Sequence, residues 1–233
     1  MTSRLLYELA GEDASLRFSP YCWRSRMALL HKGLEFTTLP WRFTEKEAIA
    51  FSGQGQVPVL VDGETVVFDS WAIAEHLERA HPDAPSLFGG AAGQAVTRFV
   101  NEFTDTVVNA GLSRLLVSDI YPLLHEKDRA YFRASRERRF GKPLEEVTAN
   151  RDADLARFRQ SLDPFRRTLA HQPFLGGSAP LYADYILFGS LQWARCVSAL
   201  EVLANDDALL AWRERLLDAF DGHARRATRH HAP

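Results

Sequence analysis

Apolar and polar residues alternate over short distances in the first third of the chain. Four short runs rich in β-branched, aromatic or leucine residues predict strands: 5–10, 35–41, 57–61 and 65–68. Two longer runs predict helices at Tyr21–Lys32 and at 70–80. Asp62 and Gly63, between the last two strands, are typical of a hairpin turn. The order strand, helix, strand, hairpin and helix predicts a small α/β domain over residues 1–82.

The remainder of the chain has a different pattern. Residues 83–93 belong to a stretch rich in proline and glycine without periodicity, which indicates a linker. Beyond it, apolar residues recur at intervals of three and four, as in amphipathic helices. The clearest sets are Val96, Phe99, Val100, Phe103 and Val107, and Leu209, Trp212, Leu216 and Phe220. Residues 94–233 are therefore predicted to form an all-helical domain.

Composition and charge exclude several classes of partner. The 233 residues are 46% hydrophobic, which is enough to build two cores. The net charge of -2 gives no large basic field, so neither nucleic acid nor an anionic membrane surface is an expected partner. The most apolar segment, from Tyr182 to Leu200, is interrupted by Asp184 and Arg195. It is expected to be a helix buried in protein rather than a membrane span.

The expected location is the cytoplasm, and no metal site is expected. Acidic residues near the N-terminus interrupt the apolar run that a signal peptide needs. Cys22 and Cys196 are too few and too far apart for a disulfide scaffold, which fits a reducing compartment. The eight histidines show no metal-ligand spacing.

The sequence Ser19-Pro20 has two explanations. Serine accepts a hydrogen bond from an otherwise unpaired amide and proline suits the first helical position, so the pair could simply begin a helix. Alternatively, the serine holds a reactive group at the positive end of that helix. No Gly-x-Ser-x-Gly elbow surrounds it, which disfavours a hydrolase nucleophile.

Val57-Pro58 favours the second explanation. A proline at the mouth of a strand cannot donate to the ladder, so it stands at an edge, a bulge or a cis turn. In the thioredoxin architecture a cis proline at this place faces the helix that carries Cys-x-x-Cys. Residues 19–22, Ser-Pro-Tyr-Cys, keep that spacing but replace the first sulfur by oxygen, which removes the dithiol.

These segments together resemble the cytosolic glutathione transferases. The resemblance rests on "SPYCWR" at 19–24, "GQVPVLVDG" at 55–63, "FDSWAIAEHL" at 68–77 and "PFLGGSAPLYADYILFG" at 173–189, in that order, over nearly the whole chain. It implies a thioredoxin-like α/β domain, an all-α helical-bundle domain, glutathione as co-substrate and a homodimer.

A narrower resemblance is to the bacterial lignin β-aryl etherases and their fungal relatives. It rests on "FSPYCWRSRMALLHKGLEF" and "PLYADYILFGSLQWAR". One position departs from the general pattern, because most glutathione transferases have Ser or Thr three residues before the Asp of the Ala-Asp pair, and here Leu181 stands there. Tyr182 to Tyr185 match the etherase-like form instead.

The resemblance implies that Ser19 is catalytic and makes the glutathione sulfur anionic. Lowering a thiol pKa by about two units needs roughly 2.7 kcal/mol in favour of the anion. A helix N-terminus contributes about 0.3–1 kcal/mol and a hydrogen bond to a charged group about 1.5–3 kcal/mol. Ser19, at the start of a helix, would supply both contributions. Serine also forms no mixed disulfide, which favours transfer to an electrophile over thiol exchange.

The other glutathione contacts are carried over position by position. Val57 would pair its backbone with the cysteinyl part beside cis Pro58, and Gln56 would contact the peptide. Ser70 would take the γ-glutamyl carboxylate, and Asp69 would face the ammonium. The glycyl carboxylate needs a cation, for which Arg42, or else Lys46, is the candidate. The alternatives are a helix cap at 69–70, a loop glutamine and solvated charges.

The second substrate is expected between the two domains. The candidates to line its site are Phe18, Tyr21 and Trp41 from the first domain, with Tyr121 or Trp193 from the second. Aromatic residues in such numbers are, however, typical of a core. The expected reaction is attack of the thiolate on an electrophilic, aromatic or aryl-ether carbon to form a thioether. Two alternatives stay open, a non-catalytic carrier of aromatic ligands and a glutathione-dependent isomerase or thiol oxidoreductase. Cys22 is more typical of a packed residue than of a redox thiol.

Overall fold

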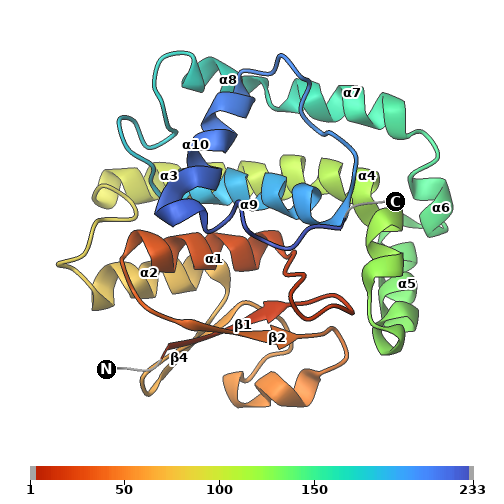
Figure 1. Cartoon of the computed structure of the whole chain (residues 1–233), viewed down its shortest axis with the longest axis horizontal. Coiled ribbons are helices and arrows are strands. Elements are labelled where there is room, and N and C mark those ends of the chain that lie inside the picture. The colour runs from red at the N-terminus through yellow and green to blue at the C-terminus, as the bar shows by residue number, and fades with distance from the viewer. Residues whose placement is uncertain (1–3, 231–233) are drawn as a thin grey trace.

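A computed structural model describes residues 4–230 (Figure 1). Its first part contains a four-stranded sheet in the order β2-β1-β3-β4. The elements are β1 (Arg4–Leu9), α1 (Pro20–His31), β2 (Thr37–Trp41), β3 (Val59–Asp62), β4 (Thr65–Phe68) and α2 (Ser70–Ala80). β1 and β2 are parallel, whereas β1 with β3 and β3 with β4 are antiparallel. This β-α-β unit followed by a hairpin and a helix confirms the predicted thioredoxin-like arrangement.

Helix α1 lies between the sheet and the helical part of the chain (Figure 1). It begins at Pro20 because Ser19 accepts from the Cys22 amide at 3.4 Å and proline occupies the first turn. Its polar residues are nevertheless buried, since both sides of the helix are covered. Arg26 pairs with buried Glu8 of β1, and Arg24 reaches Asp105 at 2.6 Å. Arg24 and Arg26 are therefore enclosed, and their charges are neutralised by partners from the helical part and from the sheet.

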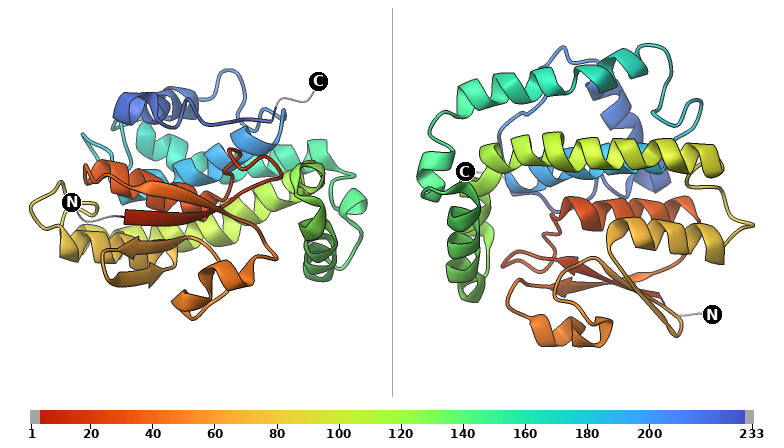
Figure 2. Two further views of the ribbon diagram at one scale, coloured as in Figure 1. Left: turned by 60° about the horizontal axis from the view of Figure 1, so that its bottom comes forward. Right: turned by 180° about the vertical axis from the view of Figure 1, so that it is seen from behind.

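The remainder of the described chain is helical, as predicted. The helices are α3 (Ala91–Phe103), α4 (Asn109–Ile120), α5 (Glu126–Phe140), α6 (Leu144–Val147), α7 (Arg151–Ser161), α8 (Asp163–Leu169), α9 (Tyr182–Val197) and α10 (Leu209–Gly222). A π-helical turn, η2 (Thr104–Val108), joins α3 to α4, and from behind the three form one long rod (Figure 2). Short 3-10 turns lie at η1 (Lys46–Ser52) and η3 (Tyr121–Leu123).

Helix α9 is the central, buried helix and packs along α1. Gly189 permits this approach, because a Cβ there would lie 2.5 Å from the Pro20 carbonyl oxygen. Asp184 closes the start of α9 in place of a side chain at Leu181, since its carboxylate accepts from the Leu181 amide at 3.0 Å. It also accepts from Trp212 Nε1 at 2.8 Å. Asp184 thus pairs with a backbone amide at the start of α9, although Leu181 provides no capping side chain where most glutathione transferases have Ser or Thr.

The apolar residues of α3 pack on the chain's own core only in part, through the half-buried Val100 and Phe103. Val96 is 67% exposed and Phe99 is 70% exposed, although their spacing suggested a buried face. The Phe99 ring stacks on Phe103, with ring centroids 6.3 Å apart. Of the helices within residues 4–230, none combines the length and the apolar character that a membrane span requires.

Candidate active site

A cavity of about 340 Å³ lies between the sheet domain and the helices. Its walls combine residues from both parts of the chain: Leu9, Phe18, Ser19, Pro20, Tyr21, Trp41, Phe43, Lys46, Gly55, Gln56, Val57, Asp105, Asn109, Ser113, Val117, Ile120, Tyr131, Phe132, Arg136, Arg139, Phe140 and Trp193. Ser19, Gln56, Val57, Phe18, Tyr21 and Trp41 are therefore brought together as expected. Pro58, Asp69, Ser70, Arg42 and Tyr121 are not among these lining residues.

Ser19 is the N-cap residue of α1, and only 5% of its surface is exposed. Its oxygen accepts from the Cys22 amide, and within residues 4–230 no acceptor takes the hydroxyl proton. The hydroxyl is therefore available to donate into the cavity. The first-turn amides of α1 point the same way, which favours a negative charge at this place.

Val57 lines the same cavity as Ser19 at the N-terminus of α1. The Val57–Pro58 peptide bond is cis, and Pro58 is buried. In the described part of the chain, the Val57 N–H and C=O make no backbone hydrogen bond. A peptide backbone in extended form would satisfy both groups in the manner of an added strand. Gln56 is exposed at the rim, where its carbonyl accepts from the Gln54 amide group.

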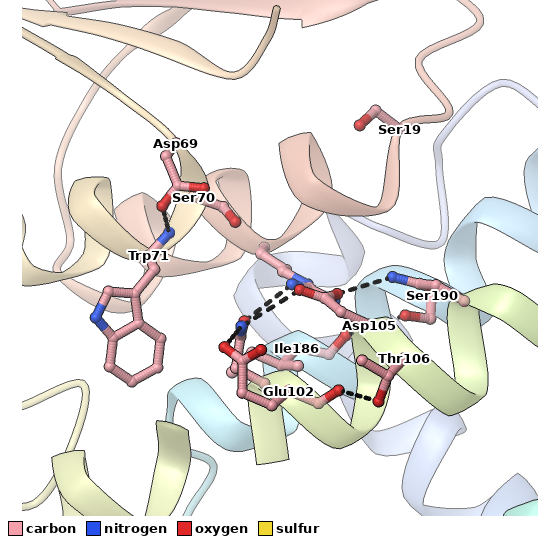
Figure 3. A network of polar contacts seen from close by, with 12 residues as sticks. Ser19, Asp69, Ser70, Trp71, Glu102, Asp105, Thr106, Ile186 and Ser190 are labelled. Carbon is pink, nitrogen blue, oxygen red and sulfur yellow. Dashed lines mark hydrogen bonds and ion pairs between the residues drawn. The ribbon is translucent and has the colours of Figure 1, made fainter. Parts of the chain in front are cut away.

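Asp69 and Ser70 begin α2, outside the cavity lining (Figure 3). The Asp69 carboxylate accepts from the Trp71 and Ala72 amides at 2.9 and 3.1 Å, so it is a helix cap. Its φ of 71° is in the left-handed region, which a non-glycine residue adopts at a free-energy penalty of about 1–3 kcal/mol. Ser70 is buried, and its carbonyl accepts from the Tyr182 hydroxyl of α9 at 2.6 Å.

The two candidate cations differ in position. The Arg42 guanidinium donates to the Gly11 carbonyl at 3.1 Å and to the Glu12 carbonyl at 3.1 Å, and it does not line the cavity. Lys46 of η1 does line it, and its ammonium donates to the Gly55 carbonyl and lies 4.8 Å from the Trp41 ring centroid. Burial lowers the pKa of Lys46, against the attraction of a nearby aspartate. Lys46 is the better placed cation.

The aromatic walls are more extensive than the sequence indicated. Trp193 lines the cavity, whereas Tyr121 does not. The Tyr121 ring packs against the Arg133 guanidinium instead, whose carbon lies 4.6 Å from the ring centroid. Four further rings were missed: Phe43, Tyr131, Phe132 and Phe140. Three of them come from the charge-rich helix α5, whose sequence carries no local signal for a ligand site. Only the docking of α5 against the sheet domain reveals their role.

The η2 turn forms a polar wall that sequence reasoning also missed. The Asp105 carboxylate accepts hydrogen bonds from the Arg24 guanidinium at 2.6 Å and from the Asn109 side-chain amide at 3.0 Å. Figure 3 shows Asp105 at the centre of a polar network. Burial raises the pKa of the Tyr21 phenol on this wall, and the charge of Asp105 raises it further. The carboxylate is thus neutralised by α1 while the turn presents polar atoms to the cavity.

Cys22 adjoins Ser19 but, unlike it, does not line the cavity. It is 1% exposed, and burial, aided by the charge of Glu8, raises its pKa to about 12. Its thiol is therefore protonated at neutral pH and lacks access to ligands, which disfavours a redox role. Between residues 4 and 230, no group of three or more His, Cys, Asp or Glu side chains is arranged to hold a metal ion.

Comparisons with known proteins identify the family of both parts. The family model for the glutathione S-transferase N-terminal domain matches residues 18–80, and the model for the C-terminal domain matches residues 95–221. A glutathione S-transferase-like protein of Aspergillus flavus is 30% identical over 141 residues, which cover 55% of this chain and 50% of that protein. A zeta-class glutathione S-transferase of Euphorbia esula is 39% identical over 70 residues, 28% of this chain and 31% of that protein. The chain thus spans half or less of these curated relatives.

Solved structures agree with the fold. A glutathione transferase from Phanerochaete chrysosporium is 27% identical with a TM-score of 0.76, covering 95% of this chain and 94% of that one. A glutathione S-transferase of Ceriporiopsis subvermispora, solved in complex with glutathione, is 20% identical with a TM-score of 0.80, covering 94% and 96%. The chain therefore belongs to the glutathione S-transferase family.

Proposed function

We propose that this protein is a glutathione transferase in which Ser19 stabilises the glutathione thiolate for attack on an aromatic electrophile. The observation that carries the proposal is the Ser19 hydroxyl, which faces the interdomain cavity at the N-terminus of α1 with no acceptor for its proton among residues 4–230. In the reaction, the sulfur forms a bond to an electrophilic carbon while the bond to the leaving group breaks. The leaving group departs with the electron pair, so no oxidant or reductant is needed.

The remaining glutathione groups have partners around this hydroxyl. The unpaired backbone of Val57 supports binding of the cysteinyl part, with Pro58 beside it and Gln56 at the rim. Asp69 and Ser70, at the start of α2, are proposed to hold the γ-glutamyl end. Lys46 replaces Arg42 as the proposed partner of the glycyl carboxylate, because Lys46 lines the cavity and Arg42 does not.

The test compares three proteins, wild type, Ser19→Ala and Ser25→Ala. Ser25 is a buried serine of the same helix whose hydroxyl donates to the Tyr21 carbonyl, so it controls for a lost hydroxyl in α1. Ultraviolet thiolate absorbance is titrated in the glutathione complex, and conjugation of a chlorinated dinitrobenzene is followed. Ser19→Ala removes a hydrogen bond to the thiolate that contributes roughly 1.5–3 kcal/mol. The pKa of the bound thiol should therefore rise by about one to two units in this variant alone. Equal titration of all three proteins would sink the proposal.

The finer substrate assignment is a β-aryl ether or a related aromatic compound. The rings of Tyr21, Phe132 and Trp193 on the cavity wall support an aromatic ligand. For an aryl ether the leaving group is a phenol, and a fluorogenic β-aryl ether measures its release directly. Ligand binding without turnover, in both this assay and the dinitrobenzene assay, would favour the non-catalytic carrier instead.

We further propose that two copies associate through the exposed face of α3. Val96 and Phe99 lie at helical spacing with their surfaces two thirds exposed or more, and Phe103 continues the same face. An apolar stripe of this kind is typical of a surface that a partner covers. Association of two copies would bury it.

A further inference from the structure

Arg136 is a cation of the cavity wall that has no charged partner within residues 4–230 and that the proposed glutathione contacts leave unused. Arg136 of α5 is half-buried, and its guanidinium donates to Ser135 Oγ at 3.0 Å. It lies 4.7 Å from the Phe132 ring centroid and 5.3 Å from that of Phe43. Across residues 4–230, no carboxylate lies within ion-pair distance of it. Burial lowers the pKa of Arg136, and the neighbouring Arg139 adds to this effect.

The missing partner is not explained by a lack of acidic residues nearby. One turn before it on the same helix, Arg133 pairs with Glu137 at 2.9 Å and with Glu145 at 2.8 Å. Across the cavity, Arg24 pairs with Asp105. Acidic partners are therefore present on the same helix and near the cavity, but none of them pairs with Arg136. Arg136 keeps its charge for the cavity interior, because arginine stays protonated in proteins.

Another lining residue, Asn109 of α4, carries a buried atom without a hydrogen-bond partner in the described chain. Asn109 is 6% exposed, and its Nδ2 donates to Asp105, which orients Oδ1 away from that carboxylate. Oδ1 is buried and has no hydrogen-bond partner within residues 4–230. The Tyr21 phenol lies close to the Asn109 side chain, whose polar contact lowers the pKa of the phenol against the larger effect of burial. This oxygen accepts only from an N–H or O–H donor, so it adds polarity to the wall but is not a partner for an anionic group.

Glutathione does not account for Arg136. Under the proposed function, its γ-glutamyl carboxylate is held at the start of α2 and its glycyl carboxylate by Lys46. The rest of the cavity lining combines aromatic rings with Arg136 and Asn109. A neutral hydrocarbon would leave both polar groups desolvated and unpaired.

We propose that the second substrate is an aromatic electrophile that bears an anionic group, with a carboxylate as its simplest form, and that Arg136 binds this group. The inference rests on the proposed function. Arg139, which also lines the cavity and forms no ion pair within the described chain, adds positive charge near the rim. The guanidinium fork of Arg136 matches a carboxylate with two parallel hydrogen bonds.

The experiment uses two matched electrophiles, para-chloro-meta-nitrobenzoate and the corresponding benzamide. In both, the glutathione sulfur bonds to the ring carbon and chloride leaves with the electron pair. Each enzymatic kcat/KM is divided by the uncatalysed rate constant with glutathione, which removes the intrinsic difference in reactivity. The wild type should favour the benzoate at least about tenfold. Arg136→Met should abolish this preference, and Arg136→Lys should restore part of it.

Arg138→Met is the matched control, since Arg138 is exposed on the same helix and does not line the cavity. It should keep the preference, and thermal unfolding should verify that all variants fold. An equal kcat/KM for both electrophiles in the wild type would overturn the inference. A raised KM for glutathione in Arg136→Met would also overturn it, because Arg136 would then hold a glutathione carboxylate.

Failure of the inference and failure of the proposed function are distinguishable by binding. Trp41 and Trp193 line the cavity, so quenching of tryptophan fluorescence reports binding of the finished S-aryl conjugates of both electrophiles. Binding and turnover of the benzamide without preference for the benzoate would contradict the inference alone. Absence of turnover with both, together with absence of glutathione binding, would contradict the proposed function.

Discussion

The Tyr182 hydroxyl of α9 donates a 2.6 Å hydrogen bond to the backbone carbonyl of Ser70, the first residue of α2. This bond joins the central helix of the helical domain to the proposed γ-glutamyl site. Both residues are buried, so the bond is shielded from water. The helical domain therefore holds in place a residue of the sheet domain that is proposed to contact glutathione.

We expect Tyr182→Phe to weaken glutathione binding through Ser70. Loss of the bond should lower the free energy of unfolding by about 1 kcal/mol and raise the KM for glutathione about two- to tenfold. Tyr185→Phe is the control, because its hydroxyl bonds to His31 Nδ1 at 2.7 Å, away from the site. Comparable effects of both variants on the KM would show that the change acts through stability only.

Lys46→Met should raise the KM for glutathione by about tenfold, because it removes the proposed partner of the glycyl carboxylate. Arg42→Met should leave this KM nearly unchanged, since its guanidinium is bound to the Gly11 and Glu12 carbonyls. Steady-state kinetics at varied glutathione concentration measures both. The reverse ranking of the two variants would restore Arg42 as the glycyl contact.

Asp69→Asn separates the roles of cap and charge. Asparagine caps a helix about as well as aspartate and tolerates the left-handed φ of 71°, so thermal stability should stay within about 0.5 kcal/mol. Removing the charge that is proposed to face the glutathione ammonium should raise the KM for glutathione about two- to fivefold, as for an exposed ion pair. Asp206→Asn removes an equal charge at an exposed position of the helical domain and should change neither quantity.

The raised pKa of the buried Cys22 thiol leads us to expect a loss of stability at alkaline pH. Its folded pKa is raised to about 12, so above the ordinary thiol pKa of about 8.5 the unfolded state releases a proton that the folded state keeps. The folded state then binds more protons, and the free energy of unfolding falls by up to about 1.4 kcal/mol per pH unit for this thiol. This contribution continues until the pH reaches the folded pKa.

Denaturant titrations between neutral pH and pH about 10 test this prediction. Cys22→Ala should lower stability at neutral pH through lost packing but flatten the alkaline slope, whereas Ser25→Ala should keep the wild-type slope. Parallel curves for wild type and Cys22→Ala would mean that the thiol ionises normally in the folded protein. The redox alternative would then regain support.

Phe99→Asp should disrupt the proposed dimer. A charge on the exposed face of α3 is tolerated by the monomer because Phe99 is 70% exposed, but it would be desolvated between two copies. Light scattering after size-exclusion chromatography should give a dimer for wild type and a monomer for the variant, with unchanged helix content. A dimeric variant would place the interface elsewhere.

Local features of the sequence determined much of the fold and the central site residue. Ser19 and Pro20 begin α1 through a hydrogen bond that spans three residues, and such short-range capping depends little on the surroundings. The strands, the hairpin and Val57-Pro58 are likewise set by short segments. The family followed from the order and spacing of those segments.

Only the tertiary structure decided which side chains meet in the cavity. Arg136, Asn109 and Lys46 come from three separate segments, and nothing in their local sequence distinguishes them from other polar helix or loop residues. The choice of Lys46 over Arg42 depends on carbonyl groups some thirty residues away, and the exposure of Phe99 depends on which surfaces α9 and α1 leave uncovered. Burial and charge pairing are properties of the packed chain, because they depend on neighbours that are distant in sequence.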